Sequence, residues 1–478
     1  MKQSNNEYYA KIDWKNNNTP QSILFDDVYY SVASGIEESN YVFTQHNKLM
    51  ERFTKLQDND VFIIGETGFG SGLNFLNVLN LWQNIVTESA KLFFISFEKH
   101  PLSPADLKKI NSGFPNFEEL EKQYYLPLRA THRLSFSHNV YLSLVIGDVN
   151  ETLAQQNFQA DAWFFDGFTP TRNSAMWSES VFLQIARLCK ANATFATYTA
   201  NSTVRRNLRN IGFHVMKDKG FSKREMLYGY WVERLPRRIF YKNPPRSSND
   251  YLIKPKPWFN RYTSKNNSHV IIIGGGISGA ATAYSLAKRG YKVTLYEQNN
   301  QLACGASGNY QAMLYGSFSA HNSSIQELSF SGYRYSHYLI KSLLNLDAEE
   351  FADCGLIQLG FNDKEIKSQL DFIKSYIPDE FCFLVNKHEI KQLAGINVNY
   401  DSGIYFPYGV WLNPQILVKK LLDSPNIKVV LQHKIDEILQ ENDEWQLIKD
   451  GKVIDKANHV VLCNADSANR FNVTKNVN

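Results

Sequence analysis

The chain has 478 residues, a length typical of two or three domains rather than one. Hydrophobic residues make up 43% and charged residues 21%, a composition that indicates a globular protein and excludes a disordered or fibrous chain. The net charge of +4 is too small to identify a partner by itself.

Cysteine spacing and hydropathy limit the kinds of site and the compartment that we expect. The five cysteines are scattered without C-x-x-C spacing, which argues against a metal site and against a disulfide framework. Isolated thiols suit a reducing compartment, and the polar segment 1–13 does not have the pattern of a signal peptide. No apolar run reaches the length of a membrane span, so we expect a cytoplasmic protein without a membrane partner.

The first informative element is a predicted buried strand at residues 61–64 that runs into a glycine-rich turn. The turn carries Glu66, Gly68, Gly70 and Gly72, and a helical pattern follows it. Strand, glycine turn and helix form the opening unit of a doubly wound α/β domain. The pattern E-x-G-x-G-x-G resembles motif I of class I methyltransferases, whose glycines let the backbone approach S-adenosylmethionine (SAM). This resemblance implies that the three glycines bind SAM and that Glu66 contacts its methionine part.

Three further acids stand at the ends of predicted strands. Glu98 ends the strand 91–98, where we expect it to hydrogen-bond the cofactor ribose. Asp148 follows the next strand and either contacts the adenine or caps the following helix. Asp166 follows the apolar strand 162–165 and is either a functional residue at the cofactor edge or a turn residue. Four acids at successive strand ends favour a SAM-binding site at the carboxyl edge of the sheet.

A basic stretch comes next. Between Arg205 and Arg246 there are 12 Lys or Arg residues and 3 Asp or Glu residues. Such an excess is typical of a polyanion-binding surface, although a solvated basic face gives the same pattern. The polar segment 237–268 is rich in proline and predicts a linker.

A second predicted strand runs into another glycine turn, beginning at residue 269. This turn has the pattern G-x-G-x-x-G at Gly274, Gly276 and Gly279. Glu297 ends the next strand about 20 residues later, as in dinucleotide-binding domains. We therefore expect Glu297 to bind the ribose of an adenosine moiety.

The segment after Glu297 favours FAD over NAD. Residues 304–311, CGASGNYQ, resemble the G-A-S-G-N-x-Q segment of flavin amine oxidoreductases of the D-amino-acid oxidase superfamily. The resemblance implies that Ser307, Gly308 and Asn309 lie against the pyrophosphate and flavin. The alternative interpretation of this segment is a glycine-rich surface loop.

These patterns together predict an α/β chain with two nucleotide-binding domains. We expect a class I, Rossmann-like methyltransferase domain at 1–236, the linker at 237–268, and a partial FAD-binding Rossmann domain at 269–478. The two strand–turn–helix units begin at residues 61 and 269, which argues for two domains and against an internal repeat.

Several longer segments together resemble one family, the bifunctional tRNA 5-methylaminomethyl-2-thiouridine biosynthesis proteins (MnmC). In the first half these segments are FDDVYYS (25–31), GIEESNYVF (35–43), ETGFGSGLNFL (66–76), ISFEKHPL (95–102), DAWFFDGFTP (161–170) and KGFSKREML (219–227). In the second half they are GGGISGA, TLYE, GASGN and SGIYFPYGVWLNP (402–414).

This resemblance implies tRNA as the partner and two reactions on its wobble uridine. The FAD domain oxidises a carboxymethylaminomethyl side chain and leaves an aminomethyl group, which the methyltransferase domain then methylates. An alkylammonium must lose a proton before it accepts a methyl group, so Asp166 is the candidate for orienting and deprotonating it. Lys219, Lys223 and Arg224 are expected to meet tRNA phosphates. Phe168 either stacks on a flipped base or packs in the core.

The C-terminal end departs from the family pattern. After the strand 459–464 the chain has only a short segment and a polar tail, whereas family members continue and supply a segment that covers the flavin. We therefore expect methylation to survive and oxidation to be impaired or absent. The alternatives are an enzyme that only methylates tRNA, a flavin amine oxidase acting on a small amino acid, and a non-catalytic tRNA-binding remnant.

Overall fold

The structure is a computed structural model of the chain. It describes residues 8–15, 19–29, 34–86, 89–125, 127–221, 225–232, 269–316, 324–347, 349–374, 377–442 and 444–471. The chain divides into two compact units: Met1–Asn260, Phe318–Arg334 and Lys367–Cys382 in the first, and Arg261–Ser317, Tyr335–Ile366 and Phe383–Asn478 in the second. The predicted linker at 237–268 lies outside the described residues, and the predicted domain limits stay a prediction.

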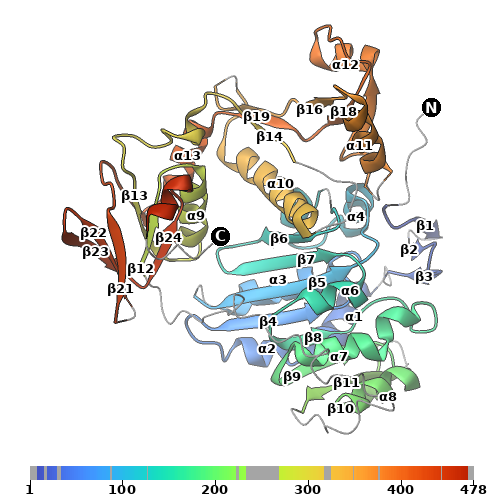
Figure 1. Cartoon of the computed structure of the whole chain (residues 1–478). Helices are drawn as coiled ribbons and strands as arrows, with labels where there is room; N and C mark the ends of the chain where they lie inside the picture. Colours follow the sequence, from blue (N-terminus) through green and yellow to red (C-terminus); the bar gives the residue numbers. More distant parts are fainter. Residues whose placement is uncertain are drawn as a thin grey trace, which may run out of the picture. The chain divides into compact units, whose positions relative to one another are not determined.

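An eight-stranded sheet forms the centre of the first unit (Figure 1). Its strands are β4 (Val61–Glu66), β5 (Lys91–Glu98), β6 (Thr131–Ser135), β7 (Val140–Ile146), β8 (Ala160–Phe164), β9 (Cys189–Thr197), β10 (Phe213–Lys219) and β11 (Glu225–Trp231). Their order is β10-β11-β9-β8-β4-β5-β7-β6. The five central strands from β9 to β7 pair in parallel, and the pairs β6–β7, β9–β11 and β10–β11 are antiparallel. The chain goes from β4 to β5 on one side and later to β8 on the other, so the order reverses between β4 and β8.

Both faces of this sheet are buried, and because side chains alternate along each strand, every central strand contributes to two cores. Phe164 of β8 belongs to the core on one face, whereas Trp163 and Phe165 belong to the core on the other. Phe165 packs against Phe182 and Phe195, at ring-centroid distances of 5.4 and 5.3 Å. This two-sided burial explains why the strand is a continuous apolar run in the sequence.

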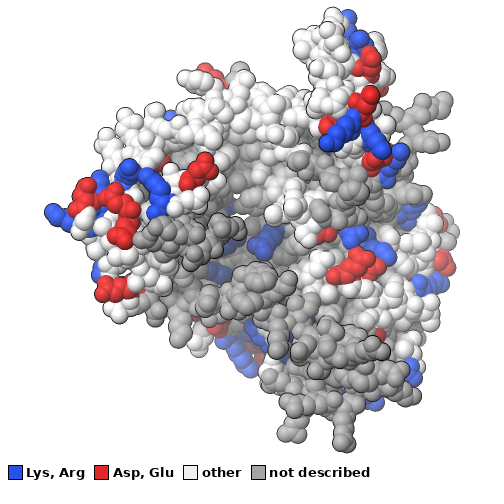
Figure 2. Space-filling model, viewed as in Figure 1, with Lys and Arg blue, Asp and Glu red and all other residues white. Residues whose placement is uncertain are grey.

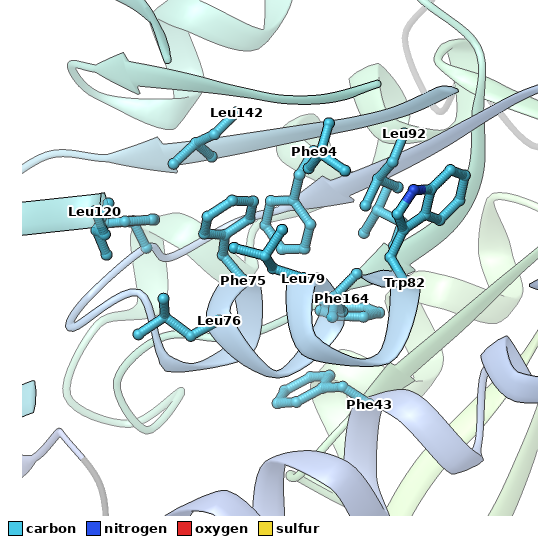
Figure 3. Packing of buried hydrophobic residues seen from close by; sticks show 14 of the residues in the cluster. Phe43, Phe75, Leu76, Leu79, Trp82, Leu92, Phe94, Leu120, Leu142 and Phe164 are labelled. Atoms are coloured by element: carbon cyan, nitrogen blue, oxygen red, sulfur yellow. The ribbon is translucent and has the colours of Figure 1, made fainter. Parts of the chain in front are cut away.

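Helix α3 (Leu73–Ile85) supplies most of the first core. Figure 3 shows Phe75, Leu79 and Trp82 of α3 facing Phe94 of β5 and its neighbours. Phe75 and Phe94 meet edge to face at 5.4 Å. Each buried aromatic of this kind contributes about 1.5–3 kcal/mol of burial free energy. This burial fixes helix α3 against the sheet and thereby also fixes the glycine turn that precedes it.

Shorter elements surround the sheet, and polar caps fix where several of them begin. Asp148, Ser178 and Asn201 each accept a backbone hydrogen bond at the start of a helix. β1, β2 and β3 form a separate three-stranded sheet. The elements are β1 (Ile12–Lys15), β2 (Thr19–Ser22), β3 (Asp27–Val28), α1 (Gly35–Ser39), η1 (Asn40–Gln45), α2 (Leu49–Phe53), α4 (Pro104–Asn111), α5 (Phe117–Gln123), α6 (Val149–Thr152), η2 (Leu153–Gln155), η3 (Ser174–Trp177), α7 (Glu179–Arg187) and α8 (Ser202–Asn210).

The second unit contains a four-stranded parallel sheet in the order β20-β13-β12-β24. Its strands are β12 (His269–Ile273), β13 (Lys292–Tyr296), β20 (Ile427–Val430) and β24 (His459–Leu462). Helix α9 (Ile277–Ala287) follows the glycine turn and buries Ala280 and Ala283 against the sheet. Small residues at these positions allow close packing of the helix on the strands.

The remaining described elements follow β13 in the chain. They are η5 (Ala306–Gly308), β14 (Ala312–Leu314), α10 (Ser324–Leu343), β15 (Phe351–Ala352), β16 (Leu356–Leu359), α11 (Asp363–Ile373), β17 (Phe383–Asn386), α12 (Lys387–Ala394), β18 (Ser402–Phe406), β19 (Val410–Leu412), α13 (Pro414–Leu422), β21 (Glu437–Glu441), β22 (Glu444–Lys449), β23 (Lys452–Ala457) and η6 (Ala465–Arg470). Among the helices in the described ranges, none is both long enough and apolar enough to cross a membrane.

Candidate functional site

A cavity of about 810 Å³ lies at the carboxyl ends of β4, β5 and β8 in the first unit. The strand order reverses here, and ligands of doubly wound sheets bind outside the carboxyl ends at that point. Six residues singled out from the sequence line this cavity: Gly68, Gly70, Glu98, Asp148, Asp166 and Phe168. Its volume is in the range of small-molecule and cofactor sites.

Asp166 follows β8, and two donors hold its carboxylate. Oδ1 accepts a hydrogen bond from the Gly167 amide at 2.8 Å, and Oδ2 accepts one from Asn74 Nδ2 at 2.7 Å. Burial raises the pKa of Asp166 to about 6, although these two hydrogen bonds oppose the increase. A carboxylate with this pKa is ionised at neutral pH and is more basic than an ordinary aspartate. The geometry suits a base whose orientation is fixed.

Asn74 of α3 connects Asp166 to the buried carboxylate of Glu66. Its Nδ2 also donates to Glu66 Oε1 at 2.9 Å, and its Oδ1 accepts from Ser39 Oγ at 2.6 Å. Glu66 Oε2 accepts from Ser96 Oγ at 2.5 Å. Burial raises the pKa of Glu66 well above its ordinary value, against the lowering effect of the Ser96 hydrogen bond.

Glu66 is completely buried and is absent from the described residues that line the cavity. The predicted contact of Glu66 with the methionine part of SAM stays a prediction. The hydrogen bonds favour a different role, in which Glu66 holds Asn74 and Asn74 holds Asp166. Asn74 itself was not singled out from the sequence, although it lies in the segment ETGFGSGLNFL. Asn74 could have been predicted from the sequence, because a polar residue on the apolar face of a helix needs a hydrogen-bond partner when it is buried.

Replacing Asn74 with Ala should move the acid limb of methylation to higher pH. The Asn74 hydrogen bond favours the charged form of Asp166, so its loss raises the pKa of Asp166 and removes the active carboxylate at a higher pH. At pH 6.5 we expect kcat/KM to fall roughly tenfold, with a smaller loss at pH 8.5. The measurement is kcat/KM from pH 5 to pH 9. Asn80→Ala, an exposed position on the same helix, should follow the wild-type profile, and an identical profile for Asn74→Ala would contradict this role.

Glu98 holds the glycine turn while it faces the cavity. Its Oε2 accepts from the Gly70 amide at 2.9 Å, and its Oε1 accepts from the His100 amide at 2.8 Å. Burial raises the pKa of Glu98, and these backbone hydrogen bonds oppose the increase. Each carboxylate oxygen can accept a further hydrogen bond, so the predicted ribose contact is compatible with this arrangement.

Asp148 caps a helix and also lines the cavity. Its Oδ1 accepts from the Asn150 amide at 2.9 Å, the cap that was one of its two predicted roles. Its Oδ2 accepts from Lys99 Nζ at 2.8 Å. Burial would raise the pKa of Asp148, but the hydrogen bonds of Lys99 and Asn150 outweigh it and lower the pKa to about 2. The predicted adenine contact stays a prediction.

The glycine turn packs closely against the loop that follows β8. A Cβ on Gly68 would lie 3.1 Å from the carbonyl oxygen of Asp166, and Gly70 has a φ of +52°. Gly72, with a φ of +77°, precedes α3 and does not line the cavity as described. The close backbone of the loop after β8 therefore requires glycine at position 68, the positive φ favours glycine at position 70, and both residues line the cavity. The residues present fit SAM, whose ribose hydroxyls match a carboxylate such as that of Glu98.

Aromatic side chains form one wall of the cavity. Phe25 and Phe168 stack with their ring centroids 4.6 Å apart, and Tyr29 meets Phe168 edge-on at 5.3 Å. All three line the cavity. Tyr198 donates from its hydroxyl to the Gly167 carbonyl at 2.7 Å and so holds the loop after Asp166. Packing of Phe168 is therefore observed, and stacking on a base stays a prediction.

Of the three predicted tRNA-binding residues, only Lys219 is described. It ends β10, is exposed, and precedes Gly220 and Phe221, which line the cavity. Lys223 and Arg224 lie outside the described residues, as does the basic stretch after residue 232. A cation beside the mouth of the cavity is well placed for a phosphate.

The second glycine turn lies between β12 and α9 in the second unit. Glu297 is buried, and its Oε2 accepts from the Gly275 amide at 2.7 Å. Its Oε1 accepts from the backbone and side-chain nitrogens of Asn299 at 2.9 and 2.7 Å. The carboxylate therefore sits against the turn, where the predicted ribose contact stays a prediction.

The glycines of this turn are required by close approaches. A Cβ on Gly279 would collide with the carbonyl oxygen of Gly274. A Cβ on Gly276 would lie 3.3 Å from Ser307 Oγ, which accepts from the Ile277 amide at 3.0 Å at the start of α9. Because the Ile277 amide already donates to Ser307 Oγ, a phosphate group at this helix N-terminus would have to use the other amides of the first turn.

The segment with Gly308 and Asn309 lies near a second cavity. The Gly308 carbonyl accepts from Gln415 Nε2 at 2.7 Å. Asn309 is exposed and lines a cavity of about 580 Å³, together with Trp411 and Asn413.

Figure 2 shows Lys or Arg and Asp or Glu intermixed over β21–β23, so these strands present charges of both signs on this face.

Asn464, which no sequence pattern indicated, is the clearest sign of a missing partner. Both polar atoms of its side chain are buried, and neither hydrogen-bonds to another described residue. Its backbone nitrogen lies 3.0 Å from the place where a Cβ on Gly274 would be. A buried amide without a partner is costly, and in FAD a phosphate oxygen could accept from Nδ2 while a ribose hydroxyl could donate to Oδ1. The residues present at this turn fit FAD.

Comparisons with known proteins agree with this geometry. Residues 112–231 match a family described as S-adenosyl-L-methionine-dependent methyltransferase, and residues 269–474 match one described as FAD dependent oxidoreductase. These matches confirm the predicted fold class, a methyltransferase domain followed by an FAD-binding domain, and the two predicted cofactors, SAM and FAD.

Whole-chain relatives show the same combination. The tRNA 5-methylaminomethyl-2-thiouridine biosynthesis bifunctional protein MnmC of Pseudomonas fluorescens (strain Pf0-1) is 35% identical over 473 residues, 97% of this chain and 69% of the relative. The Chromobacterium violaceum protein of the same name is 39% identical over 428 residues, 88% of this chain and 62% of the relative. A crystal structure of MnmC2 from Aquifex aeolicus is similar over 47% of this chain and 71% of its own chain, with 22% sequence identity and a TM-score of 0.38.

Proposed function

The chain belongs to the family of bifunctional tRNA 5-methylaminomethyl-2-thiouridine biosynthesis proteins, and we propose that it modifies the wobble uridine of tRNA in the cytoplasm. One reaction removes the carboxymethyl group from a carboxymethylaminomethyl side chain. The other methylates the resulting primary amine. The observation that carries the second reaction is the oriented Asp166 carboxylate in the cavity of the methyltransferase domain.

The proposed methylation depends on positioning and on one proton transfer. SAM, when bound, supplies a methyl group on a positively charged sulfur, which the amine nitrogen accepts as it loses a proton. Asp166 binds the ammonium form and takes that proton, while Gly167 and Asn74 hold its two oxygens. Glu98 and Asp148 hold the nucleoside part of the cofactor. We assign SAM binding to Gly68, Gly70, Gly72, Glu98 and Asp148, with Glu66 in support.

The proposed oxidation takes place in the second unit. FAD, when bound, accepts two electrons and a proton from the carbon–nitrogen unit of the side chain, and water then releases the two-carbon fragment as an aldehyde acid. The chain's own residues hold the dinucleotide at the turn between β12 and α9. We assign FAD binding to Gly274, Gly276, Gly279, Glu297, Ser307, Gly308, Asn309 and Asn464.

Lys219 should contribute to tRNA binding through a phosphate contact. We expect Lys219→Ala to weaken tRNA binding a few-fold and to reduce the slope of log Kd against log salt by about one. SAM affinity should not change, because the side chain is exposed and is not among the lining residues. Fluorescence anisotropy with labelled tRNA at several salt concentrations measures the slope. Lys55→Ala, an exposed lysine on another segment, is the matched control, and equal slopes for both variants would contradict the contact.

Nucleoside mass spectrometry tests the proposed function and separates it from its rivals. With tRNA that carries the carboxymethylaminomethyl group, we expect the aminomethyl nucleoside without SAM and the methylaminomethyl nucleoside with SAM. Methylation of aminomethyl tRNA without loss of the carboxymethyl group would identify an enzyme that only methylates. Oxidation of free amino acids with unchanged tRNA would identify an amine oxidase, and tRNA binding without SAM binding in calorimetry would identify a binding protein.

A further inference from the structure

A second carboxylate, that of Glu38, lines the same cavity as Asp166. Glu38 lies in α1 and is half-buried, whereas its neighbour Glu37 is exposed. The next residue of α1, Ser39, donates from Oγ to Asn74 Oδ1 at 2.6 Å, and Asn74 in turn donates to Asp166. The hydrogen bonds of Asn74 therefore connect Asp166 with α1, the helix that carries Glu38.

The two carboxylates are close enough to repel each other. Burial is the largest cause that raises the pKa of Asp166, and the negative charge of Glu38 adds to it. The lysine and arginine of the cavity wall are occupied elsewhere: Lys99 and Arg172 each pair with an aspartate of their own, at 2.8 and 3.3 Å. Within the described ranges, Glu38 has no cation paired with it. This part of the cavity is suited to a positively charged group.

We propose that Glu38 selects the substrate of the methylation step by admitting a primary ammonium and rejecting the same side chain when its nitrogen still carries a carboxymethyl group. This inference rests on the proposed function. The aminomethyl group carries one positive charge, which Glu38 and Asp166 both attract. The carboxymethylaminomethyl group adds a carboxylate, and in a partly buried site Glu38 repels it strongly.

Selection of this kind sets the order of the two reactions. Methylation before removal of the carboxymethyl group would convert a secondary amine into a tertiary amine and lead to a different product. With Glu38 in place, an amine enters the methyltransferase cavity productively only after the carboxymethyl group has gone. Glu38 would thus enforce the order of reactions that the proposed function already contains.

The test compares methylation of two tRNAs by the full chain at pH 8. One tRNA carries the aminomethyl group and the other the carboxymethylaminomethyl group, and mass spectrometry distinguishes their N-methylated products. For Glu38→Gln we expect the ratio of the two kcat/KM values, aminomethyl over carboxymethylaminomethyl, to fall roughly tenfold relative to the wild type. Glu38→Ser is measured in parallel, so the result does not depend on the folding of one variant.

Glu37→Gln, which removes an exposed charge from the same helix, should keep the wild-type ratio. A wild-type ratio in both Glu38 variants, with normal methylation of aminomethyl tRNA, would overturn the inference and leave the proposed function intact. If the wild-type chain methylates neither tRNA, the proposed function fails and the inference fails with it.

Discussion

Asp166→Asn should reduce kcat for methylation of aminomethyl tRNA by roughly 10²–10⁴, the contribution expected from a positioned general base. The asparagine side chain has the same shape but cannot accept the ammonium proton. It also places an amide nitrogen or oxygen opposite two donors, Gly167 N and Asn74 Nδ2, so one of the two hydrogen bonds is lost. SAM affinity should change by only a few-fold, because Asp166 is assigned to the amine and not to the cofactor.

Single-turnover methylation and calorimetric SAM binding measure these two effects separately. The pH dependence provides a second check. In the wild type, kcat/KM should fall as pH decreases through about 6, where Asp166 becomes protonated, and this limb should be missing from the residual activity of Asp166→Asn. Asp60→Asn, an exposed substitution just before β4, should leave both measurements unchanged. Normal kcat in Asp166→Asn would exclude Asp166 as the base.

Gly279→Val should abolish FAD binding while methylation continues. Any Cβ at this position collides with the carbonyl oxygen of Gly274, so the strand and helix that enclose the dinucleotide cannot keep their present distance. We expect the flavin occupancy of the purified protein to fall more than about tenfold, because the larger side chain cannot be packed at this turn without displacing its backbone. Methylation of aminomethyl tRNA should stay near the wild-type rate, because the cavity with Asp166 lies in the first unit.

Flavin absorbance and labelled methyl transfer, measured on the same preparation, test both halves of this prediction. The unchanged methylation also shows that the variant chain has folded around its first sheet. Gly332→Ala is the control, since a Cβ at Gly332 meets no atom within 4 Å. Full flavin occupancy in Gly279→Val would show that the dinucleotide does not bind at this turn.

Local patterns in the sequence predicted the two turns and most of the central strands. The strand predicted at 91–98 is β5, and the apolar run 61–64 is the start of β4, which extends to Glu66. These strands are predictable because they are buried on both faces and therefore apolar throughout. The same local reasoning identified the acids at the strand ends, of which Glu98, Asp148 and Asp166 line one cavity.

Local patterns could not show which residues from distant segments complete the cavity. Phe25 and Glu38 come from segments before β4. Phe25 lies in the loop between β2 and β3 and Glu38 lies in α1, and both line the cavity of Asp166 only because these segments pack beside it. Both lie in segments that carried the family resemblance, but neither has a spacing that indicates a role. The sequence did not indicate Asn74 or Asn464 for a related reason. Asn74 matters because it donates a hydrogen bond to Asp166, and Asn464 because its buried side chain lacks one, and both facts are visible only in the folded chain.

The turn between β12 and α9 carries residues to which we assign FAD binding, and the unsatisfied amide of Asn464 lies beside it. The amount of aminomethyl nucleoside formed without SAM measures the proposed oxidation. Methylation does not depend on that outcome, because aminomethyl tRNA can be supplied directly.

Transfer of a labelled methyl group from SAM to tRNA bearing 5-aminomethyl-2-thiouridine measures amine methylation at the Asp166 cavity itself. With the wild-type chain, we predict that the label appears in the methylaminomethyl nucleoside, at one methyl group per modified uridine. We predict no label in tRNA that lacks the aminomethyl group. Absence of label from aminomethyl tRNA, with SAM bound and the protein folded, would contradict the assignment of the Asp166 cavity to amine methylation.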